Sequence, residues 1–152
     1  MTLYDYLLKI YEDYGFQKET TINVVRPGKT GAEEIQQMMK DYRANAPKEI
    51  AGEKVIKIKD FKLLEQKKWE NGKWENEKIE MPLNATSNVL QYFTEGGLKV
   101  SVRPSGTEPK IKFYFEIPVK TEIGKPFTGA DYERCTAEAE ARVPAIKASL
   151  GL

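Results

Sequence analysis

Apolar and polar residues alternate strictly along two short runs of the chain, residues 98–103 and 110–117. This period of two predicts two β-strands, each with one buried and one polar face. Arg103 and Lys112 both fall on the polar face. If the two runs pair as an antiparallel hairpin, Arg103 and Lys112 share that face, whereas a slip of one residue in register would separate them.

Similar patterns predict the other elements. The expected strands cover residues 20–25, 54–63 and 88–94, and the polar segment 65–80, with its Asn71-Gly72 turn signal, is either an exposed excursion or a small hairpin. The first expected helix covers residues 3–14, is capped by Thr2 with Asp5 and ends at Gly15. The second is capped by Thr30 with Glu33 and ends before Pro47. The last is capped by Thr128 with Asp131, and Pro144 should bend or interrupt it.

The predicted order after the first helix is strand, helix, four strands, helix. Such an order is typical of an α+β layer, in which an antiparallel sheet carries both helices on one face. At 152 residues and 40% hydrophobic content, the chain is long enough to bury a core of its own.

The turn between residues 103 and 112 concentrates groups that bind anions. The guanidinium of Arg103 matches phosphate oxygens, and the hydroxyls of Ser105 and Thr107 add donors. We expect Gly106 to let the backbone turn so that successive amides face one anion. The alternative interpretation is an ordinary exposed hairpin whose charges are solvated.

The run RPSGTEPKIKFY at residues 103–114, preceded by PLNATSNVL at 82–90 and by Gly96-Gly97, closely resembles the C-terminal domain of the phosphohexomutases, the phosphoglucomutase/phosphomannomutase family. A weaker similarity covers the rest of the chain from residue 20 onward. The segment before it resembles the last helix of the preceding domain in that family. The resemblance therefore divides the chain into residues 1–19, a helix and linker of the preceding domain, and residues 20–152, a phosphate-binding domain.

This resemblance implies a TATA-binding-protein-like β-α-β4-α topology and a site that holds the phosphate of a phosphosugar. Arg103, Ser105, Gly106 and Thr107 match the phosphate-binding positions, and Lys112 stands where many relatives have a second arginine. The implied role is to clamp the non-reacting phosphate of a hexose phosphate or bisphosphate during intramolecular phosphoryl transfer. The lysine preserves the charge but not the planar geometry of arginine.

The family's serine loop, its Mg²⁺-binding aspartate loop and its sugar-reading loop are missing from this sequence, which contains no histidine. Phosphoryl transfer needs a positioned acceptor and usually a metal. We therefore assign no catalytic or metal-binding residue here and expect the chain to be inactive alone. Its expected partners are the preceding domains of an isomerase that uses Mg²⁺.

Charge and composition exclude several classes of protein. The net charge is +1, from 24 basic and 23 acidic residues, so no global attraction for nucleic acid or an anionic membrane is expected. The sequence shows no targeting segment and no apolar run long enough to span a membrane. Its one cysteine, Cys135, is expected to be a buried structural thiol, which fits a cytoplasmic protein.

Two other functions stay open at this stage. Lysines at 54, 57, 59, 62, 67 and 68, followed by Trp69 and Trp74, are compatible with a nucleic-acid module, although interleaved acidic residues cancel their field. A purely structural or interaction domain is the third alternative. A nucleotide-binding P-loop at Gly28-Lys29-Thr30 is excluded, because Asn23 stands where the motif requires glycine.

Overall fold

The computed structural model describes residues 1–152, except for the side chain of Asn84, which belongs to the PLNATSNVL run and lies outside the described part. The elements are α1 (Leu3–Tyr14), β1 (Phe16–Val25), α2 (Gly31–Ala44), β2 (Glu49–Ile50), β3 (Glu53–Asp60), β4 (Glu65–Glu70), β5 (Lys73–Lys78), the short 3₁₀ helix η1 (Pro82–Asn84), β6 (Leu90–Thr94), β7 (Lys99–Pro104), β8 (Lys110–Val119) and α3 (Gly129–Ser149).

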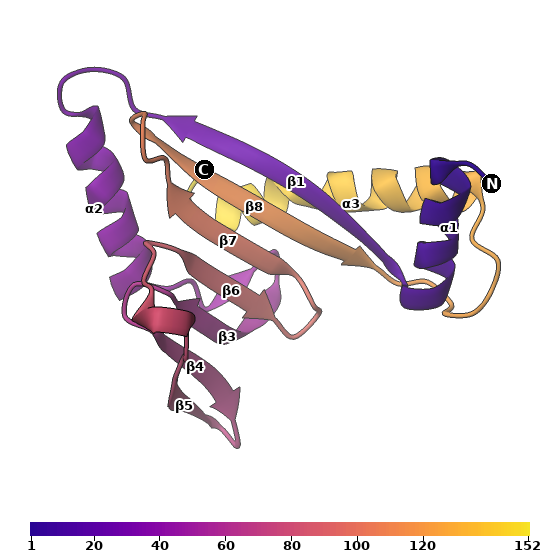
Figure 1. Ribbon diagram of the computed structural model, residues 1–152, viewed down its shortest axis with the longest axis horizontal. Coiled ribbons are helices and arrows are strands. Elements are labelled where there is room, and N and C mark those ends of the chain that lie inside the picture. The colour runs from indigo at the N-terminus through magenta and orange to yellow at the C-terminus, as the bar shows by residue number, and fades with distance from the viewer.

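One antiparallel sheet organises the molecule, with the strand order β1-β8-β7-β6-β3-β4-β5 and the short β2 paired to β3 (Figure 1). The main topology is strand, helix, four strands, helix, with the β4–β5 hairpin inserted between β3 and β6. The α+β prediction is confirmed.

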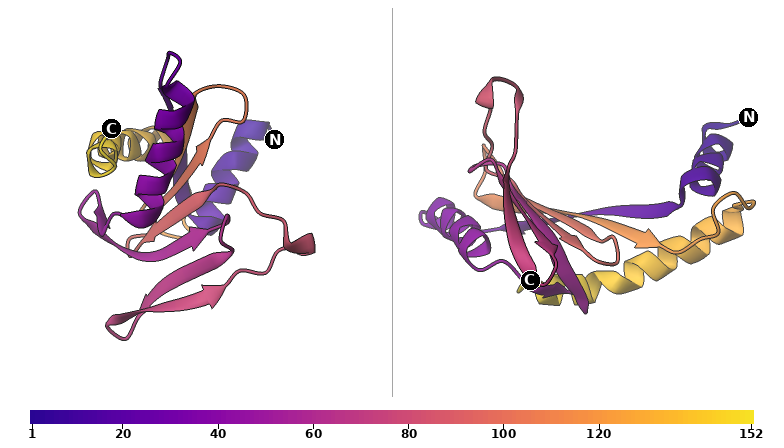
Figure 2. Two further views of the ribbon diagram at one scale, coloured as in Figure 1. Left: turned by 90° about the vertical axis from the view of Figure 1, so that its left-hand side faces the viewer. Right: turned by 90° about the horizontal axis from the view of Figure 1, so that it is seen from below.

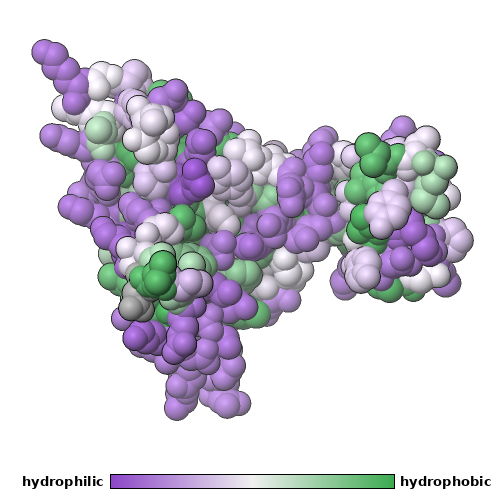
Figure 3. Space-filling model, in the orientation of Figure 1, coloured by the Kyte–Doolittle hydropathy of each residue, from purple (hydrophilic) through white to green (hydrophobic). Residues whose placement is uncertain are grey.

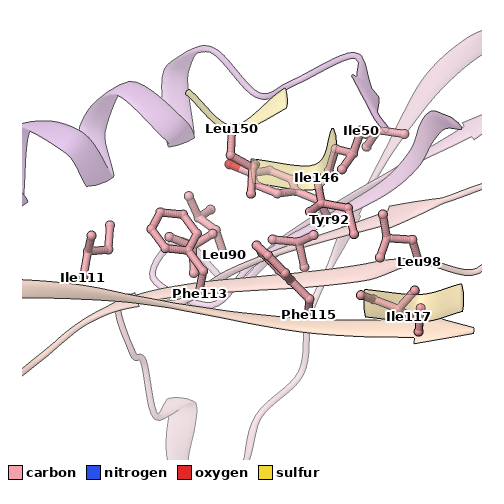
Figure 4. Packing of buried hydrophobic residues seen from close by; sticks show 14 of the residues in the cluster. Ile50, Leu90, Tyr92, Leu98, Ile111, Phe113, Phe115, Ile117, Ile146 and Leu150 are labelled. Atoms are coloured by element: carbon pink, nitrogen blue, oxygen red, sulfur yellow. The ribbon is translucent and has the colours of Figure 1, made fainter. Parts of the chain in front are cut away.

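Both α2 and α3 cover the same face of this sheet (Figure 2). The core lies between them and the sheet, where inward side chains of β6, β7 and β8 meet those of the helices (Figure 4). Cys135 of α3 is buried in this layer, and burial raises the pKa of its thiol. The prediction of a buried structural cysteine is confirmed.

The strand bounds differ from the sequence prediction by up to four residues, and β1 and β3 show the physical reasons. β1 begins at Phe16 rather than at residue 20, because it pairs with β8 in register over its whole length. β3 ends at Asp60 rather than at residue 63, because the Asp60 carboxylate accepts hydrogen bonds from the amides of Lys62 and Leu63. These contacts turn the chain away from the sheet.

The polar segment 65–80 forms a hairpin, β4–β5, which extends the main sheet through the pairing of β4 with β3. Asn71 and Gly72 both have positive φ angles, 52° and 78°, as a two-residue hairpin turn requires. The turn signal in the sequence was therefore correct.

The helix ends follow the predicted caps with one exception. Thr2 with Asp5, and Thr128 with Asp131, form complete capping boxes. Thr30 makes no side-chain cap hydrogen bond, because its backbone is already helical and its hydroxyl donates to Glu34 at 3.2 Å; the predicted capping box with Glu33 is wrong.

Pro144 does not interrupt α3, which is a single helix over Gly129–Ser149 and curves gently along the sheet (Figure 2). Residues on both sides of the proline, Ala139 and Ile146, are fully buried against the core. This packing compensates for the one backbone hydrogen bond that proline cannot donate.

α1 packs against the start of α3 through aromatic contacts. The ring centroid of Tyr11 lies 4.9 Å from that of Phe16 and 5.4 Å from that of Phe127. The outer side of α1 stays in solvent, where the side chain of Leu3 is 91% exposed and that of Tyr14 is 82% exposed. The division of the chain after residue 19 stays a prediction.

The sheet face that is turned away from α2 and α3 is called the open face here. It is predominantly hydrophilic, and the apolar residues visible from this side gather at α1 and around η1 (Figure 3). Among the described residues, no helix has the length and apolar character needed to cross a membrane.

Candidate functional site

The candidate anion-binding residues lie where β7 and β8 meet. These strands pair antiparallel, and Arg103 stands directly opposite Lys112. Their neighbours Val102, Ile111 and Phe113 are fully buried on the helix-covered face, so Arg103 and Lys112 occupy the open face. The two runs pair as a hairpin without the one-residue slip that the sequence left open, so the two cations share one face.

Hydrogen bonds within the strand connection order the turn, residues 103–109. The Ser105 amide donates to the Lys110 carbonyl at 2.9 Å, and the Lys110 amide donates to the Glu108 carbonyl at 2.8 Å. The Ser105 hydroxyl accepts a long contact, 3.4 Å, from the Thr107 amide. A weak internal contact of this kind can be exchanged for a ligand oxygen at little cost.

Gly106 lies in the turn without a left-handed backbone conformation. Its φ is not positive, so the turn does not depend on a left-handed glycine at this position. A β-carbon placed there would meet nothing within 4 Å, so the residue borders open space. The Gly106 amide has no acceptor among the described residues. Glycine thus leaves this backbone donor accessible to a ligand rather than permitting an unusual backbone angle.

The charges of the turn are distributed unevenly. Lys110 Nζ lies 2.9 Å from Glu108 Oε2, and the hydrogen bond from Lys110 lowers the pKa of the Glu108 carboxyl. Lys110 is therefore neutralised within the turn. Neither Arg103 nor Lys112 forms an ion pair with any described residue. The two charges that face outward are the two without an ion-pair partner, although the charge of Lys112 also contributes to lowering the pKa of Glu108.

The loop between β1 and α2 supports the turn from the side. The Arg26 amide donates to the Pro109 carbonyl at 2.8 Å. A β-carbon on Gly31 would lie 1.8 Å from the Arg26 carbonyl oxygen and 3.2 Å from Pro109 Cβ, so only glycine fits there. This support was missed in the sequence, because the Arg26-Pro27-Gly28 run signals a turn but not what the turn contacts.

Asn23 of β1 is a second neighbour that sequence reasoning missed. It pairs with Lys112 in the β1–β8 register, so Asn23, Lys112 and Arg103 form one row across three strands of the open face. The alternation of β1 places Asn23 on an exposed position. The β-branched pattern predicted this strand but not its partner.

A shallow groove of about 350 Å³ continues from Arg103 across the open face. Its polar lining comes from β1, β6, β7 and β8. It includes Gln91, Ser101, Tyr114 and Lys99, and also the carboxylates of Glu19 and Glu116. A ligand held at the turn therefore has room to extend over the sheet.

The lysines and tryptophans of residues 54–74 do not form one surface. Lys57 and Lys59 belong to the open face, whereas Trp69 and Trp74 pair edge-to-face on the other side of the sheet, with ring centroids 5.6 Å apart. Lys54 Nζ covers the Trp69 ring at 3.7 Å. With Trp69 covered, Trp74, which is 39% exposed beside Lys48 and Lys67, is a single open ring rather than a platform for stacking successive bases.

The residues of this chain do not fit a Mg²⁺ site. Among the described residues, no three His, Cys, Asp or Glu side chains are grouped so that they could hold a metal ion. Mg²⁺ prefers carboxylate oxygens in octahedral geometry. No catalytic step through a metal is assigned to the residues of this chain.

Comparison with known proteins identifies the family. The sequence model described as "Phosphoglucomutase/phosphomannomutase, C-terminal domain" matches residues 22–125. The chain belongs to this family.

Phosphoglucomutases from staphylococci are similar to this family member. The protein of Staphylococcus saprophyticus is 33% identical over 120 residues, which are 78% of this chain and 21% of the relative. That of Staphylococcus haemolyticus is 35% identical over 118 residues, 78% of this chain and 20% of the relative. The family domain described here thus spans about a fifth of the length of these relatives.

A solved structure, the open form of the exocytosis-sensitive phosphoprotein pp63/parafusin from Paramecium, covers 99% of this chain with 24% of its own length. Its TM-score is 0.45 and its sequence identity 16%.

Proposed function

We propose that Arg103, Ser105, Gly106 and Thr107, together with Lys112, bind the non-reacting phosphate of a phosphosugar within a larger phosphohexomutase. The observation that carries this proposal is the cross-strand pairing of Arg103 and Lys112 on the open face, beside a turn that is rich in donors. Both cations lack an ion-pair partner among the described residues. Two outward charges at one spot favour an anionic ligand.

Each residue contributes differently to this phosphate site. Arg103 supplies a planar fork for two phosphate oxygens, and Lys112 adds a compact charge from the neighbouring strand. The Ser105 and Thr107 hydroxyls and the Gly106 amide donate hydrogen bonds from the turn. The buried residues beneath the two strands fix the spacing of the cations, so little order has to be gained on binding.

In a full-length phosphohexomutase, this clamp would act at a distance from the reacting atoms. Binding energy from a part of the substrate that does not react can be used to orient the sugar and close the active site. Contacts limited to a phosphate suit a reaction in which the bisphosphorylated intermediate turns around, because either phosphate can then occupy the site. The transferring serine and the metal would come from other domains.

The isolated chain is expected to bind phosphate weakly. One exposed clamp supplies about 4 kcal/mol of binding free energy, which corresponds to a Kd of roughly 1 mM. In a two-dimensional NMR titration with inorganic phosphate at constant ionic strength, the amides of Ser105, Gly106 and Thr107 should shift most, and those of Arg103 and Lys112 should follow.

Glucose 1-phosphate should produce the same shifts, and glucose should not. Shifts centred on Trp69 and Trp74 with an oligonucleotide would favour a nucleic-acid function instead. If the turn does not respond to phosphate up to tens of millimolar (roughly ten times the expected Kd), the phosphate role of this turn in the isolated chain is wrong.

The isolated chain is also expected to lack mutase activity with Mg²⁺ and a bisphosphate activator. The described residues contain no metal ligand cluster, and the sequence lacks the family's serine loop. A coupled assay that follows conversion of glucose 1-phosphate tests this expectation. Turnover above a buffer blank that disappears in the Arg103→Ala variant would contradict it.

A further inference from the structure

Lysines gather around one phenylalanine ring on the open face, away from the phosphate-binding turn. Lys57 Nζ lies 4.5 Å from the centroid of the Phe93 ring, Lys59 Nζ lies 5.5 Å from it, and Lys99 Nζ lies 5.7 Å from it. Lys57 and Lys59 come from β3, Lys99 comes from β7 and Phe93 comes from β6, so only the sheet brings the cluster together. We call Lys57, Lys59 and Lys99 the lysine cluster.

The strand register places these charges side by side. Lys57 pairs with Phe93 across β3 and β6, and Phe93 pairs with Lys99 across β6 and β7. On its other side, Lys57 stands directly opposite Lys68 of β4. Like charges that face each other across a sheet destabilise it. Folding therefore creates a local concentration of positive charge that the sheet itself does not favour.

The nearby carboxylates form ion pairs only at the rim of this cluster, although the charge of Lys57 also helps to lower the pKa of Glu77. Glu116 Oε1 lies 3.7 Å from Lys99 Nζ, and Glu77 Oε2 lies 3.3 Å from Lys68 Nζ. Lys57 and Lys59, at the centre, form no ion pair with a described residue. Burial, and then the charges of Lys57, Lys99 and Lys68, lower the pKa of Lys59. The centre of the cluster is thus short of negative charge.

The Phe93 ring makes a surface on which several ammonium groups can be held by cation–π attraction while their N–H donors stay available. Phe93 and the three lysines are all half-buried, so their stems pack on the sheet and their positions are partly fixed. An oxyanion could accept hydrogen bonds from more than one of them. These contacts recognise the charged oxygens of a ligand and not its carbon skeleton.

We propose that Lys57, Lys59 and Lys99, arranged around Phe93, form a second oxyanion-binding subsite that accepts a phosphoryl group. This subsite is separate from the turn, because the Cα atoms of Lys59 and Arg103 lie on strands two apart and are offset by two residues, or about 12 Å. The groove lined by Arg103, Ser101 and Lys99 connects the two positions. The inference rests on different residues from those of the proposed function.

The test is an NMR titration of the 152-residue chain with inorganic phosphate, with chloride used to match the ionic strength. Lysine side-chain ¹H–¹³C signals report on the cluster, and turn amides report on Arg103, Ser105 and Thr107. We expect two independent sets of saturating shifts. In the Lys57→Gln/Lys59→Gln variant the cluster set should require about tenfold more phosphate, since a charge-assisted contact is lost, while the turn set stays unchanged.

The matched control is Lys62→Gln/Lys73→Gln, which removes the same charge from two exposed positions outside the cluster. It should leave both sets unchanged. Arg103→Ala should abolish the turn set and keep the cluster set. A result in which the turn set fails and the cluster set persists would refute the proposed function and support the subsite.

Stability provides a second readout. Removing two mutually repelling charges should raise the Tm of Lys57→Gln/Lys59→Gln in phosphate-free buffer, and phosphate should stabilise this variant less than it stabilises the control. The subsite is refuted if the cluster signals shift no more with phosphate than with chloride. It is also refuted if the control variant weakens the cluster response as much as the cluster variant does.

Discussion

Replacing Arg103 by alanine in a full-length phosphoglucomutase that carries this domain is expected to lower kcat/KM by about 30- to 1000-fold. In the proposed role, Arg103 is a bidentate partner of a substrate phosphate enclosed in the complete active site, and its removal costs roughly 2–4 kcal/mol. Phosphorylation of the catalytic serine by a bisphosphate should be less affected. Steady-state kinetics and a separate assay of enzyme phosphorylation distinguish the two effects.

Lys112→Ala is the natural comparison, because Lys112 occupies the paired position on the neighbouring strand. It should cost less than Arg103→Ala, since water can partly replace a point charge but not a planar fork. Equal stability of the two variants, measured by thermal unfolding, would show that neither effect comes from misfolding. A larger loss for Lys112→Ala would reverse the ranking proposed for the two residues.

Replacing Asp60 by alanine is expected to lower the stability of the fold strongly. The Asp60 carboxylate accepts from Arg43 Nε at 2.7 Å and from the Lys62 amide at 3.0 Å, and Asp60 is only 8% exposed. Its loss leaves the Arg43 guanidinium with Asn88 alone as a side-chain partner in this network. Removing one member of such a buried pair costs about 3 kcal/mol, or about 6–12 °C in Tm.

Two variants test the cause of that loss. Asp60→Asn keeps a side chain that can accept hydrogen bonds but lacks the charge, so its destabilisation should be intermediate. Glu65→Ala removes a carboxylate from the exposed position that pairs with Asp60 across β3 and β4, and it should change stability by no more than about 0.5 kcal/mol. Urea unfolding measures all three. If Asp60→Ala unfolds with the free energy of the unchanged chain, the Arg43–Asp60 contact is not stabilising.

The turn was found from sequence because its chemistry is contiguous. Arg103, Ser105, Gly106 and Thr107 are neighbours in the chain, and the alternation of the flanking strands fixed the face of Arg103. Pairing Arg103 with Lys112 required only one short hairpin. Residue type alone did not show how Gly106 serves the turn, because it does not distinguish a left-handed glycine from one that leaves space beside the backbone.

Contacts between distant segments could not be predicted in the same way. The lysine cluster depends on β6 lying between β3 and β7, and the support of the turn by Arg26 and Gly31 depends on β1 pairing with β8. Periodicity gives the face of each residue on its own strand, but it carries no information on which strand lies next to it. The polar residues at the start of β1 likewise belong to a strand only because β8 supplies their partners.

The sequence by itself predicted the helices and main strands, the α+β class and the residues of the proposed anion-binding turn, because local hydrogen bonding, side-chain alternation and turn chemistry act over a few residues. Only the tertiary structure decided the strand order, the register that sets Arg103 opposite Lys112 and the gathering of Lys57, Lys59 and Lys99 around Phe93. These features arise because the strands bury one common apolar face beneath α2 and α3. Burying that face fixes the register of all the strands at once and leaves their polar side chains together on the other face.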